Sequence, residues 1–374
     1  MSDRLFVTTR KGLFTFERAN GRSGPPWRIA RTAFVGDNVT LVLPDRRDGA
    51  LYAALNHGHF GCKVHRSRDG GTSWEEIGTP TYPPKPDGYE EPPNPMGGAP
   101  IPWTLKLIWS LEAGGPDQEG LLWCGTLPGG LFRSEDSGTN WSLVSTLWDL
   151  PERKEWFGGG ADWPGIHSIC VDPRDSRRLL LGVSCGGVWV TEDGGATWKC
   201  QAEGMRAAYM PPDRANDPNM QDAHRLALCP VRPDSLWVQH HNGIFRSTDG
   251  AKSWHEITEA GPSTFGFPVV VHPKEPDTAW FVPGISDEKR IPVDGKVVVT
   301  RTRDGGKTFD VLRDGLPQEY AYDIVFRHAM DIDGSGDRLA FGSTTGSVWT
   351  TDDQGDRWTQ VASHLPPVYC VRFG

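Results

Sequence analysis

The chain has 374 residues, a formal net charge of −9 and many turn-forming residues, with 45 Gly and 31 Pro. An acidic balance argues against a nucleic-acid-binding platform, which would carry a basic face. No apolar run approaches the length of a membrane helix. We therefore expect neither a nucleic-acid partner nor a membrane partner.

The start of the chain and its cysteines bear on location. Met1-Ser-Asp-Arg4 leads directly into a predicted strand, without the basic and apolar segments of a signal peptide. The seven cysteines are an odd number, and Cys170, Cys229 and Cys370 fall on predicted interior strand positions. Reduced, buried thiols are typical of proteins in a reducing compartment. We therefore expect a cytoplasmic protein.

Three short strand-like segments open the chain, at residues 5–9, 12–16 and 27–30. An octapeptide then recurs six times, with a hydroxyl residue first, Asp third, mostly Gly in the middle and an aromatic residue last. The six copies are Ser67–Trp74, Ser134–Trp141, Thr191–Trp198, Ser247–Trp254, Thr302–Phe309 and Thr351–Trp358. A repeat period near fifty residues with strand-like patterning indicates a β-propeller or a repeat array.

The residue types of the octapeptide predict a tight hairpin turn. The hydroxyl and the carboxylate two residues later accept hydrogen bonds from backbone N–H groups. Gly supplies the positive φ that such a turn needs. The closing aromatic residue starts the next strand and packs against the neighbouring unit.

The segments around each octapeptide supply the other strands of a blade. Around the fourth copy, for example, strand-like runs occupy residues 226–228, 235–239, 243–247 and 254–257. One orphan strand, residues 368–373, remains at the C-terminus. Joined to the three N-terminal strands, it completes a seventh four-stranded blade and closes the ring, which removes the exposed sheet edges of an open array.

We therefore predict an all-β fold, a single seven-bladed β-propeller over residues 1–374. The first blade combines residues 1–31 with 366–374. The other six blades are predicted at about residues 32–80, 100–147, 165–202, 222–259, 264–314 and 320–365.

The octapeptide resembles the Asp box, or bacterial neuraminidase repeat. That motif occurs in sialidases, two-propeller xyloglucanases, sortilin-type receptors and a photosystem II assembly factor of the Ycf48 type. The resemblance implies a sialidase-like or glycosyl-hydrolase-like propeller. It is specific for the fold and says little about function, because the motif stabilises a turn.

Sialidases carry Arg-Ile-Pro near the N-terminus, where the arginine helps to hold the substrate carboxylate. This chain has Arg290-Ile-Pro292, but after four octapeptides rather than before them. Sialidase domains also have six blades rather than seven. We therefore do not expect sialidase activity.

In a propeller, the loops between blades and those between second and third strands share one face, which usually carries the ligand site. The three longest insertions, Thr79 to Pro102, Leu147 to Pro164 and Glu203 to Gln221, are blade-to-blade loops on that face. Their length and their aromatic and charged residues favour a structured rim or lid.

Histidines gather on the same predicted face. Neutral imidazoles that converge with a carboxylate make a site for a divalent transition metal such as Zn, Mn, Fe or Cu. The candidate metal ligands are His57, His59, His167, His224 and His240. The alternative is that these histidines are hydrogen-bonded polar residues lining a wet channel.

Carboxylates, arginines and aromatic residues also cluster in or beside these loops. Glycoside hydrolysis needs two carboxyl groups, and aromatic rings stack on sugars. The candidate catalytic residues are Asp222, Glu203, Arg225 and Asp162. The candidate substrate-binding residues are Trp103, Trp163, Tyr209, Tyr320 and Arg206. The alternative for each is surface charge or loop packing.

Two functional hypotheses remain open. The first is an enzyme, a glycoside hydrolase or a metal-dependent hydrolase or lyase, with a small-molecule or carbohydrate site at the channel mouth. The second is a non-catalytic propeller that binds a protein partner through the same face, in an assembly role of the Ycf48 type. The convergence of histidines, carboxylates and aromatic residues favours the first.

Overall fold

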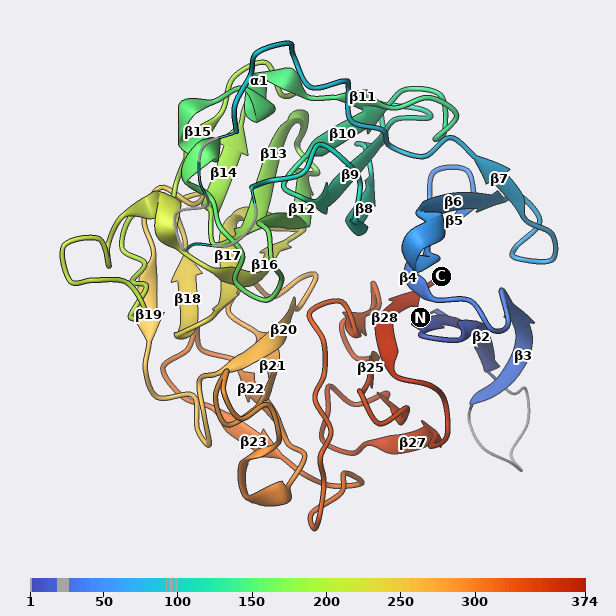
Figure 1. Ribbon diagram of the computed structural model, residues 1–374. Coiled ribbons are helices and arrows are strands. Elements are labelled where there is room, and N and C mark those ends of the chain that lie inside the picture. The colour runs from blue at the N-terminus through green and yellow to red at the C-terminus, as the bar shows by residue number, and fades with distance from the viewer. Residues whose placement is uncertain (1, 19–26, 92, 94–96, 98–99) are drawn as a thin grey trace.

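Seven four-stranded antiparallel sheets are arranged in a ring around a common axis (Figure 1). The computed structural model describes residues 2–18, 27–91, 93, 97 and 100–374. The predicted seven-bladed β-propeller is therefore confirmed. Part of the Thr79 to Pro102 insertion lies outside the described residues.

In each blade, the strand named first lies innermost and the strand named last lies at the outer edge. The first blade holds β28 (Val368–Phe373), β1 (Arg4–Thr9), β2 (Gly12–Arg18) and β3 (Trp27–Ala33). The second holds β4 (Val39–Pro44), β5 (Leu51–Asn56), β6 (Cys62–Ser67) and β7 (Glu75–Ile77). The third holds β8 (Leu107–Ala113), β9 (Leu122–Leu127), β10 (Leu131–Ser134) and β11 (Ser142–Leu143). The fourth holds β12 (Gly165–Asp172), β13 (Asp175–Ser184), β14 (Gly187–Thr191) and β15 (Lys199–Cys200).

The remaining three blades follow the same order. The fifth holds β16 (Ala223–Cys229), β17 (Arg232–His240), β18 (Gly243–Ser247) and β19 (His255–Ile257). The sixth holds β20 (Gly266–Val271), β21 (Ala279–Pro283), β22 (Val299–Thr302) and β23 (Asp310–Leu312). The seventh holds β24 (Met330–Ile332), β25 (Leu339–Gly342), β26 (Val348–Thr351) and β27 (Thr359–Ala362).

Helices are short and lie between strands. They are α1 (Ser145–Trp148) and the 3-10 turns η1 (Gly58–Phe60), η2 (Pro151–Glu155), η3 (Pro218–Met220) and η4 (Val293–Gly295). None of the helices in the described part of the chain has the length and apolar character needed to span a membrane.

The two ends of the chain close the ring, as predicted. β28 pairs antiparallel with β1, with Val371 opposite Val7. The innermost strands contact one another all the way round, including β28 with β4 and β24 with β28. Hydrophobic side chains fill the spaces between blades, and one cluster joins Trp27 of the first blade to Phe341 of the seventh.

The hydrogen bonds predicted for the octapeptide turns are present. In the fourth copy, Asp249 Oδ1 accepts from the backbone N–H of Ser253 at 3.0 Å, and Ser247 Oγ accepts from Ala251 N–H at 3.0 Å. The indole N–H of Trp254 donates to the carbonyl of Gln201 in the preceding blade at 2.9 Å. Each copy therefore closes its own hairpin, and the closing Trp of this copy also ties two blades together.

The turn aspartates predict a loss of stability in acid. Hydrogen bonds from Thr197 and Thr308 lower the pKa of Asp193 and of Asp304, respectively, to about 2. The unfolded value is about 3.9, so the stabilisation is complete above that pH and is lost as pH falls towards 2. We expect urea unfolding to show a steep fall in stability over this window and a shallower fall in Asp304→Asn. An unchanged slope in the variant would contradict this.

All seven cysteines are free thiols, as predicted, although Cys170, which was predicted to be interior, is only partly buried. Cys229 and Cys370 are buried, and burial raises the pKa of both thiols. Thiols protonated in this way behave as small apolar side chains of the core.

Candidate functional site

Two cavities occupy opposite ends of the central channel. The first, of about 320 Å³, lies where the innermost strands begin, among residues that include Thr40 of β4 and Trp109 of β8. The second, of about 410 Å³, lies where these strands end, near Glu112 and Arg372. The first cavity is on the face with the long blade-to-blade loops, and we call it the mouth cavity.

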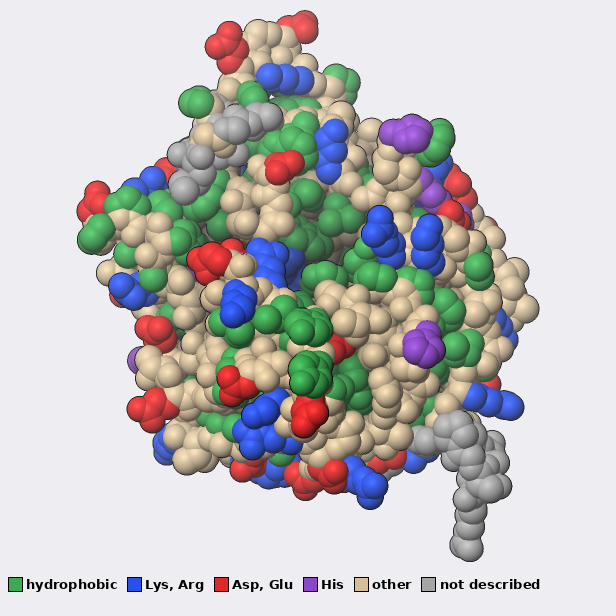
Figure 2. Space-filling view, turned by 60° about the horizontal axis from the view of Figure 1, so that its bottom comes forward, with side chains coloured by type: hydrophobic (Ala, Val, Ile, Leu, Met, Phe, Trp, Pro, Cys, Tyr) green, Lys and Arg blue, Asp and Glu red, His purple; other side chains and the backbone are tan. Residues whose placement is uncertain are grey.

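The mouth cavity combines aromatic and basic side chains. Figure 2 shows a hollow in which hydrophobic side chains lie next to Lys and Arg side chains. The lining residues are Asn38, Thr40, Leu41, Leu107, Ile108, Trp109, Gly160, Phe267, Arg290, Phe326, Arg327, His328 and Tyr369. None of these described lining residues is Asp or Glu.

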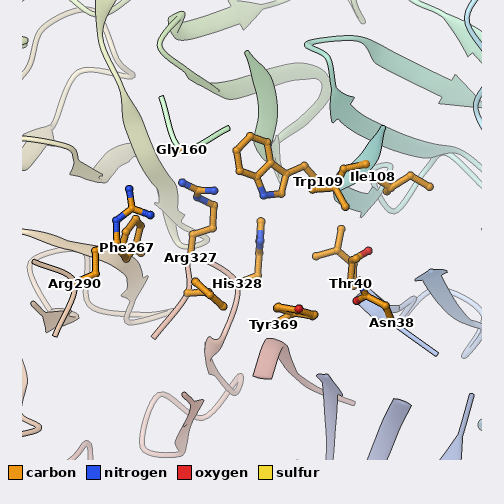
Figure 3. A pocket seen from close by; sticks show the side chains of 13 residues that line it. Asn38, Thr40, Ile108, Trp109, Gly160, Phe267, Arg290, Arg327, His328 and Tyr369 are labelled. Carbon is orange, nitrogen blue, oxygen red and sulfur yellow. The ribbon is translucent and has the colours of Figure 1, made fainter. Parts of the chain in front are cut away.

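Arg327 lies at the centre of this lining, beside Trp109 (Figure 3). Its guanidinium carbon is 4.5 Å from the Trp109 ring centroid and 5.8 Å from that of Phe267. Its Nε donates to the carbonyl of His224 at 2.9 Å. Burial lowers the pKa of Arg327 to about 10, so the group stays cationic at neutral pH.

The two arginines of the cavity differ in their partners. Arg290 lies over Phe267 at 5.4 Å and forms an ion pair with Asp287. Across the described ranges, no carboxylate forms an ion pair with Arg327. The mouth cavity therefore carries one guanidinium whose charge is not neutralised by a direct partner.

The floor of the mouth cavity is closed by polar side chains within the channel. His328 Nε2 lies 2.7 Å from the carbonyl oxygen of His167 and donates to it, and Arg225 Nη1 donates to the same oxygen at 3.5 Å. Burial, followed by the charge of Arg372, lowers the pKa of Arg225. Arg225 thus lies inside the channel and does not line the mouth cavity.

A buried carboxylate and two imidazoles form a second group beside the mouth cavity. Asp222 Oδ2 lies 3.5 Å from His224 Nε2 and 3.5 Å from His241 Nδ1. The His224 ring stacks on Phe267, a wall residue of the cavity, with centroids 4.7 Å apart. We call Asp222, His224 and His241 the DHH group, and in the described ranges it is the group with metal-ligand spacing.

The electrostatics of the DHH group favour an ionised carboxylate. Burial alone would raise the pKa of Asp222, but His224 and His241 outweigh it and hold that pKa well below its usual range. Burial disfavours the charged form of His241, but the nearby Asp222 carboxylate outweighs burial and raises the pKa of His241.

Hydrogen bonds join two of the rim loops to each other. Trp156 is fully buried, and its indole N–H donates to Asn219 Oδ1 at 2.7 Å. The Asn219 amide donates to the carbonyl of Glu152 at 2.8 Å. These contacts join the 147–164 and 203–221 insertions, which form a structured rim as expected.

Of the predicted metal ligands, only His224 belongs to the DHH group. His240 is fully buried, with both ring nitrogens 3.1 Å from backbone N–H groups, and its neighbour His241 takes the place beside Asp222. His167 is buried against Trp109, with Nδ1 3.0 Å from Ser168 Oγ.

The histidines of the second blade lie apart from the group. His57 Nδ1 is 3.7 Å from Asp37 Oδ1, and the exposed His59 packs on Phe60. The structure therefore does not bring His57 or His59 to the other predicted ligands.

Of the predicted catalytic residues, Asp222 is in the DHH group and Arg225 is in the channel. Asp162 and Glu203 are exposed and do not line the mouth cavity. The structure thus does not pair two carboxyl groups across this cavity, because the rim loops carry both of these side chains outward into solvent.

The predicted substrate-binding residues are dispersed. The Trp103 indole N–H donates to Glu91 at 3.0 Å, and Trp163 packs on the core of the second and third blades under Lys106. The Tyr209 hydroxyl donates to the carbonyl of Met220 at 2.6 Å, and its ring contacts His241. Arg206 and Tyr320 are exposed and lie outside the cavity lining.

The sequence reasoning missed Trp109, Phe267 and Arg327 as site residues. Trp109 and Phe267 lie near the starts of innermost strands β8 and β20, the position that His167 and His224 occupy in β12 and β16. That shared register was the signal that could have found them. Arg327 lies in the loop before the short strand β24, where no motif marks it.

No family model matches the chain. The chain is 26% identical over 221 residues to an oligoxyloglucan-reducing end-specific xyloglucanase of Emericella nidulans, covering 56% of this chain and 24% of that protein. A xyloglucanase of Paenibacillus sp is 22% identical over 307 residues, covering 70% and 27%. The chain thus spans about a quarter of the length of these relatives.

Solved structures share the fold at low sequence identity. An ancestral GH74 enzyme matches 87% of this chain and 38% of its own, with a TM-score of 0.58 and 15% identity. YCF48 from Cyanidioschyzon merolae matches 87% and 84%, with a TM-score of 0.53 and 14% identity. The chain is therefore a seven-bladed β-propeller with xyloglucanase relatives, glycosyl-hydrolase-like in its fold.

Proposed function

We propose that this glycosyl-hydrolase-like propeller binds a small acidic carbohydrate in the mouth cavity. The observation that carries the proposal is the Arg327 guanidinium, which faces the cavity beside Trp109 without a carboxylate partner among the described residues. The Asp222 carboxylate acts on this cation only at longer range, so an anionic ligand in the cavity would gain a direct ion pair with it. Arginine matches the planar geometry of a carboxylate with two parallel hydrogen bonds.

The other lining residues fit a sugar ring. Trp109, Phe267 and Tyr369 contribute aromatic rings to the wall, and Asn38 and Thr40 contribute hydrogen-bonding groups. Pockets that bind small molecules combine apolar walls with a few placed polar groups in this way. The carbohydrate class is also supported by the xyloglucanases among the relatives.

Catalysis by two carboxyl groups is not part of this proposal. Such a mechanism needs an acid and a base on either side of the bond to be broken, and the described lining of the mouth cavity has neither Asp nor Glu. Sugar binding in this proposal does not require a metal. The metal expected from the histidines is a separate proposal, with Asp222, His224 and His241 as the group that has suitable spacing.

A protein partner is the second candidate function. Tyr320 and Tyr322 are 84% and 62% exposed, and YCF48 bound to D1 peptide shares the fold at a TM-score of 0.51 and 13% identity. Replacing both tyrosines by Ser should weaken capture of a protein partner and leave sugar binding unchanged. Loss of sugar binding in that variant would count against the mouth cavity as the sugar site.

Calorimetric titration of the protein with oligogalacturonides and with neutral xyloglucan oligosaccharides tests the proposal. We expect the acidic sugars to bind at least about tenfold more tightly, because only they pair with Arg327. Their affinity should fall with added salt, since the interaction is between charges. Equal binding of the neutral sugars, or no binding of either class, would overturn the proposal.

A further inference from the structure

The DHH group lies at the start of the fifth blade, next to the wall of the mouth cavity. Asp222 directly precedes β16, His224 is the second residue of β16, and His241 directly follows β17. β16 and β17 pair antiparallel, with Ala223 opposite His240, so the pairing brings the three side chains together. The position is set by two paired strands rather than by a mobile loop.

The distances in the group suit a shared cation better than a direct contact. Asp222 Oδ2 is 3.5 Å from a nitrogen of each histidine. Hydrogen bonds between N–H and O are normally about 2.7–3.2 Å long. Four ligands bonded to a metal at about 2.1 Å in tetrahedral geometry lie about 3.4 Å apart. The two Asp222–histidine separations therefore match those of a tetrahedral metal site, and all three ligand atoms lie within 4.8 Å of one another.

The tautomer of His224 also favours metal binding. Its Nδ1 lies 2.7 Å from the carbonyl oxygen of Gly266, so Nδ1 carries the proton and donates it. In a neutral ring, Nε2 then presents a lone pair towards the Asp222 carboxylate. A backbone carbonyl that orients a histidine through its second nitrogen is the usual support of a metal-ligating imidazole.

Asp222 is held in position by its other oxygen. Oδ1 accepts from the Ser184 hydroxyl and from the Cys185 backbone N–H, both at 3.3 Å, which leaves Oδ2 facing the histidines. The side chain is buried, and no Lys or Arg in the described ranges forms an ion pair with it. Arg327 acts on this carboxylate only through a longer-range charge interaction. A buried carboxylate that no cation contacts directly can still accept a metal ion.

The loop at residues 158–160 covers this oxygen closely. A Cβ atom on Gly159 would lie 2.7 Å from Asp222 Oδ2 and 2.7 Å from Cys185 Sγ. The next residue, Gly160, lines the mouth cavity. Glycine at position 159 thus lets the main chain pass without blocking the carboxylate on the side of the cavity.

We propose that Asp222, His224 and His241 bind a divalent first-row transition metal, with Zn²⁺ as the ion that the spacing fits. Two imidazoles and one carboxylate are a donor set found in catalytic zinc sites and non-haem iron sites. When bound, such an ion polarises a ligand oxygen and stabilises negative charge that develops on it. Three protein ligands leave the remaining coordination position to a water or a ligand.

This metal site goes beyond sugar binding and is tested without any sugar. The untagged protein, stripped with chelator and reloaded with Zn²⁺ or Co²⁺, is analysed for bound metal by mass spectrometry and titration. We expect one ion per chain and, with Co²⁺, the visible bands of tetrahedral cobalt. In His241→Gln, affinity should fall about 100-fold or more, since even loss of a supporting residue costs 10–100-fold.

Matched variants separate loss of a ligand from loss of the fold. His57→Ala removes a histidine outside the DHH group and should keep full metal binding, with the same thermal melting curve as the wild type. Gly159→Val keeps all three ligands and should weaken binding, because its side chain would crowd Asp222 Oδ2. His241 is partly exposed, so His241→Gln stays folded even if Asp222→Asn does not.

The proposal is overturned if the reloaded wild-type protein binds no ion, or if His57→Ala loses as much metal as His241→Gln. An iron-selective site with the same variant pattern would support the ligand set and replace Zn²⁺ as the ion. Sugar titrations are run on both the stripped and the reloaded protein, because the Asp222 charge acts on Arg327. Metal binding and sugar binding are thus measured separately, and failure of one proposal is distinguishable from failure of the other.

Discussion

Replacing Arg327 by Gln is expected to abolish binding of acidic sugars to the mouth cavity. The guanidinium lies at the centre of the lining and is the cation there that lacks a carboxylate partner in the described part of the chain. Hydrogen bonds that involve a charged group contribute about 1.5–3 kcal/mol each, and two such bonds correspond to at least about a 100-fold loss of affinity. Calorimetric titration with oligogalacturonides measures this loss.

Two control variants locate the effect. Arg327→Lys keeps the charge but loses the planar fork, so its affinity should lie between those of the wild type and Arg327→Gln. Arg357→Gln removes an exposed arginine from the octapeptide turns on the opposite face and should bind like the wild type. If Arg327→Gln binds as tightly as Arg357→Gln, the sugar does not contact Arg327.

Removal of β28 is expected to prevent cooperative folding. Deleting residues 368–374 takes away the innermost strand of the first blade, including Val368, Val371 and Phe373, which are buried. It also exposes the edge of β1 and opens the ring, which leaves unpaired backbone groups. Urea unfolding followed by tryptophan fluorescence should show no cooperative transition in the shortened chain.

Point variants measure how much a single buried side chain of β28 contributes to the unfolding free energy. Phe373→Ala should cost about 3–5 kcal/mol of unfolding free energy, as large-to-small changes of buried aromatic residues do. Tyr320→Ala, at a side chain that is 84% exposed, should stay within about 0.5 kcal/mol of the wild type. A shortened chain that unfolds with the wild-type midpoint would show that closure by β28 is not needed.

The architecture was predictable because a repeated motif marks it. Each octapeptide places a turn between the outer two strands of a blade, and the six copies therefore set the strand order across most of the chain. The pairing of β28 with β1 followed from one orphan strand and three strands without an octapeptide. Strand alternation and turn chemistry are local properties, which is why the residue pattern reveals them.

The site was only partly predictable because it depends on side-chain direction. The adjacent residues His240 and His241 cannot be told apart as ligands by spacing, but the end of β17 turns His240 into the blade and leaves His241 beside Asp222. Arg327 comes from a loop with no motif, and its contacts with Trp109 and with the His224 carbonyl join residues far apart in the sequence.

Side-chain direction in the rim loops was also not predictable from the sequence. Trp103 and Trp163 carry the right chemistry for sugar stacking, but both pack against the core of the second and third blades. Asp162 and Glu203 are exposed on the same loops. Loop composition therefore identified a structured rim without showing which side chains face inward. The cytoplasmic location expected from the cysteines stays a prediction.

A crystal structure of the protein soaked with digalacturonate tests the central claim most directly. The account predicts a sugar in the mouth cavity, with its carboxylate paired to the Arg327 guanidinium and its ring against Trp109. A sugar bound instead in the cavity at the other end of the channel, near Arg46 and Arg372, would contradict it.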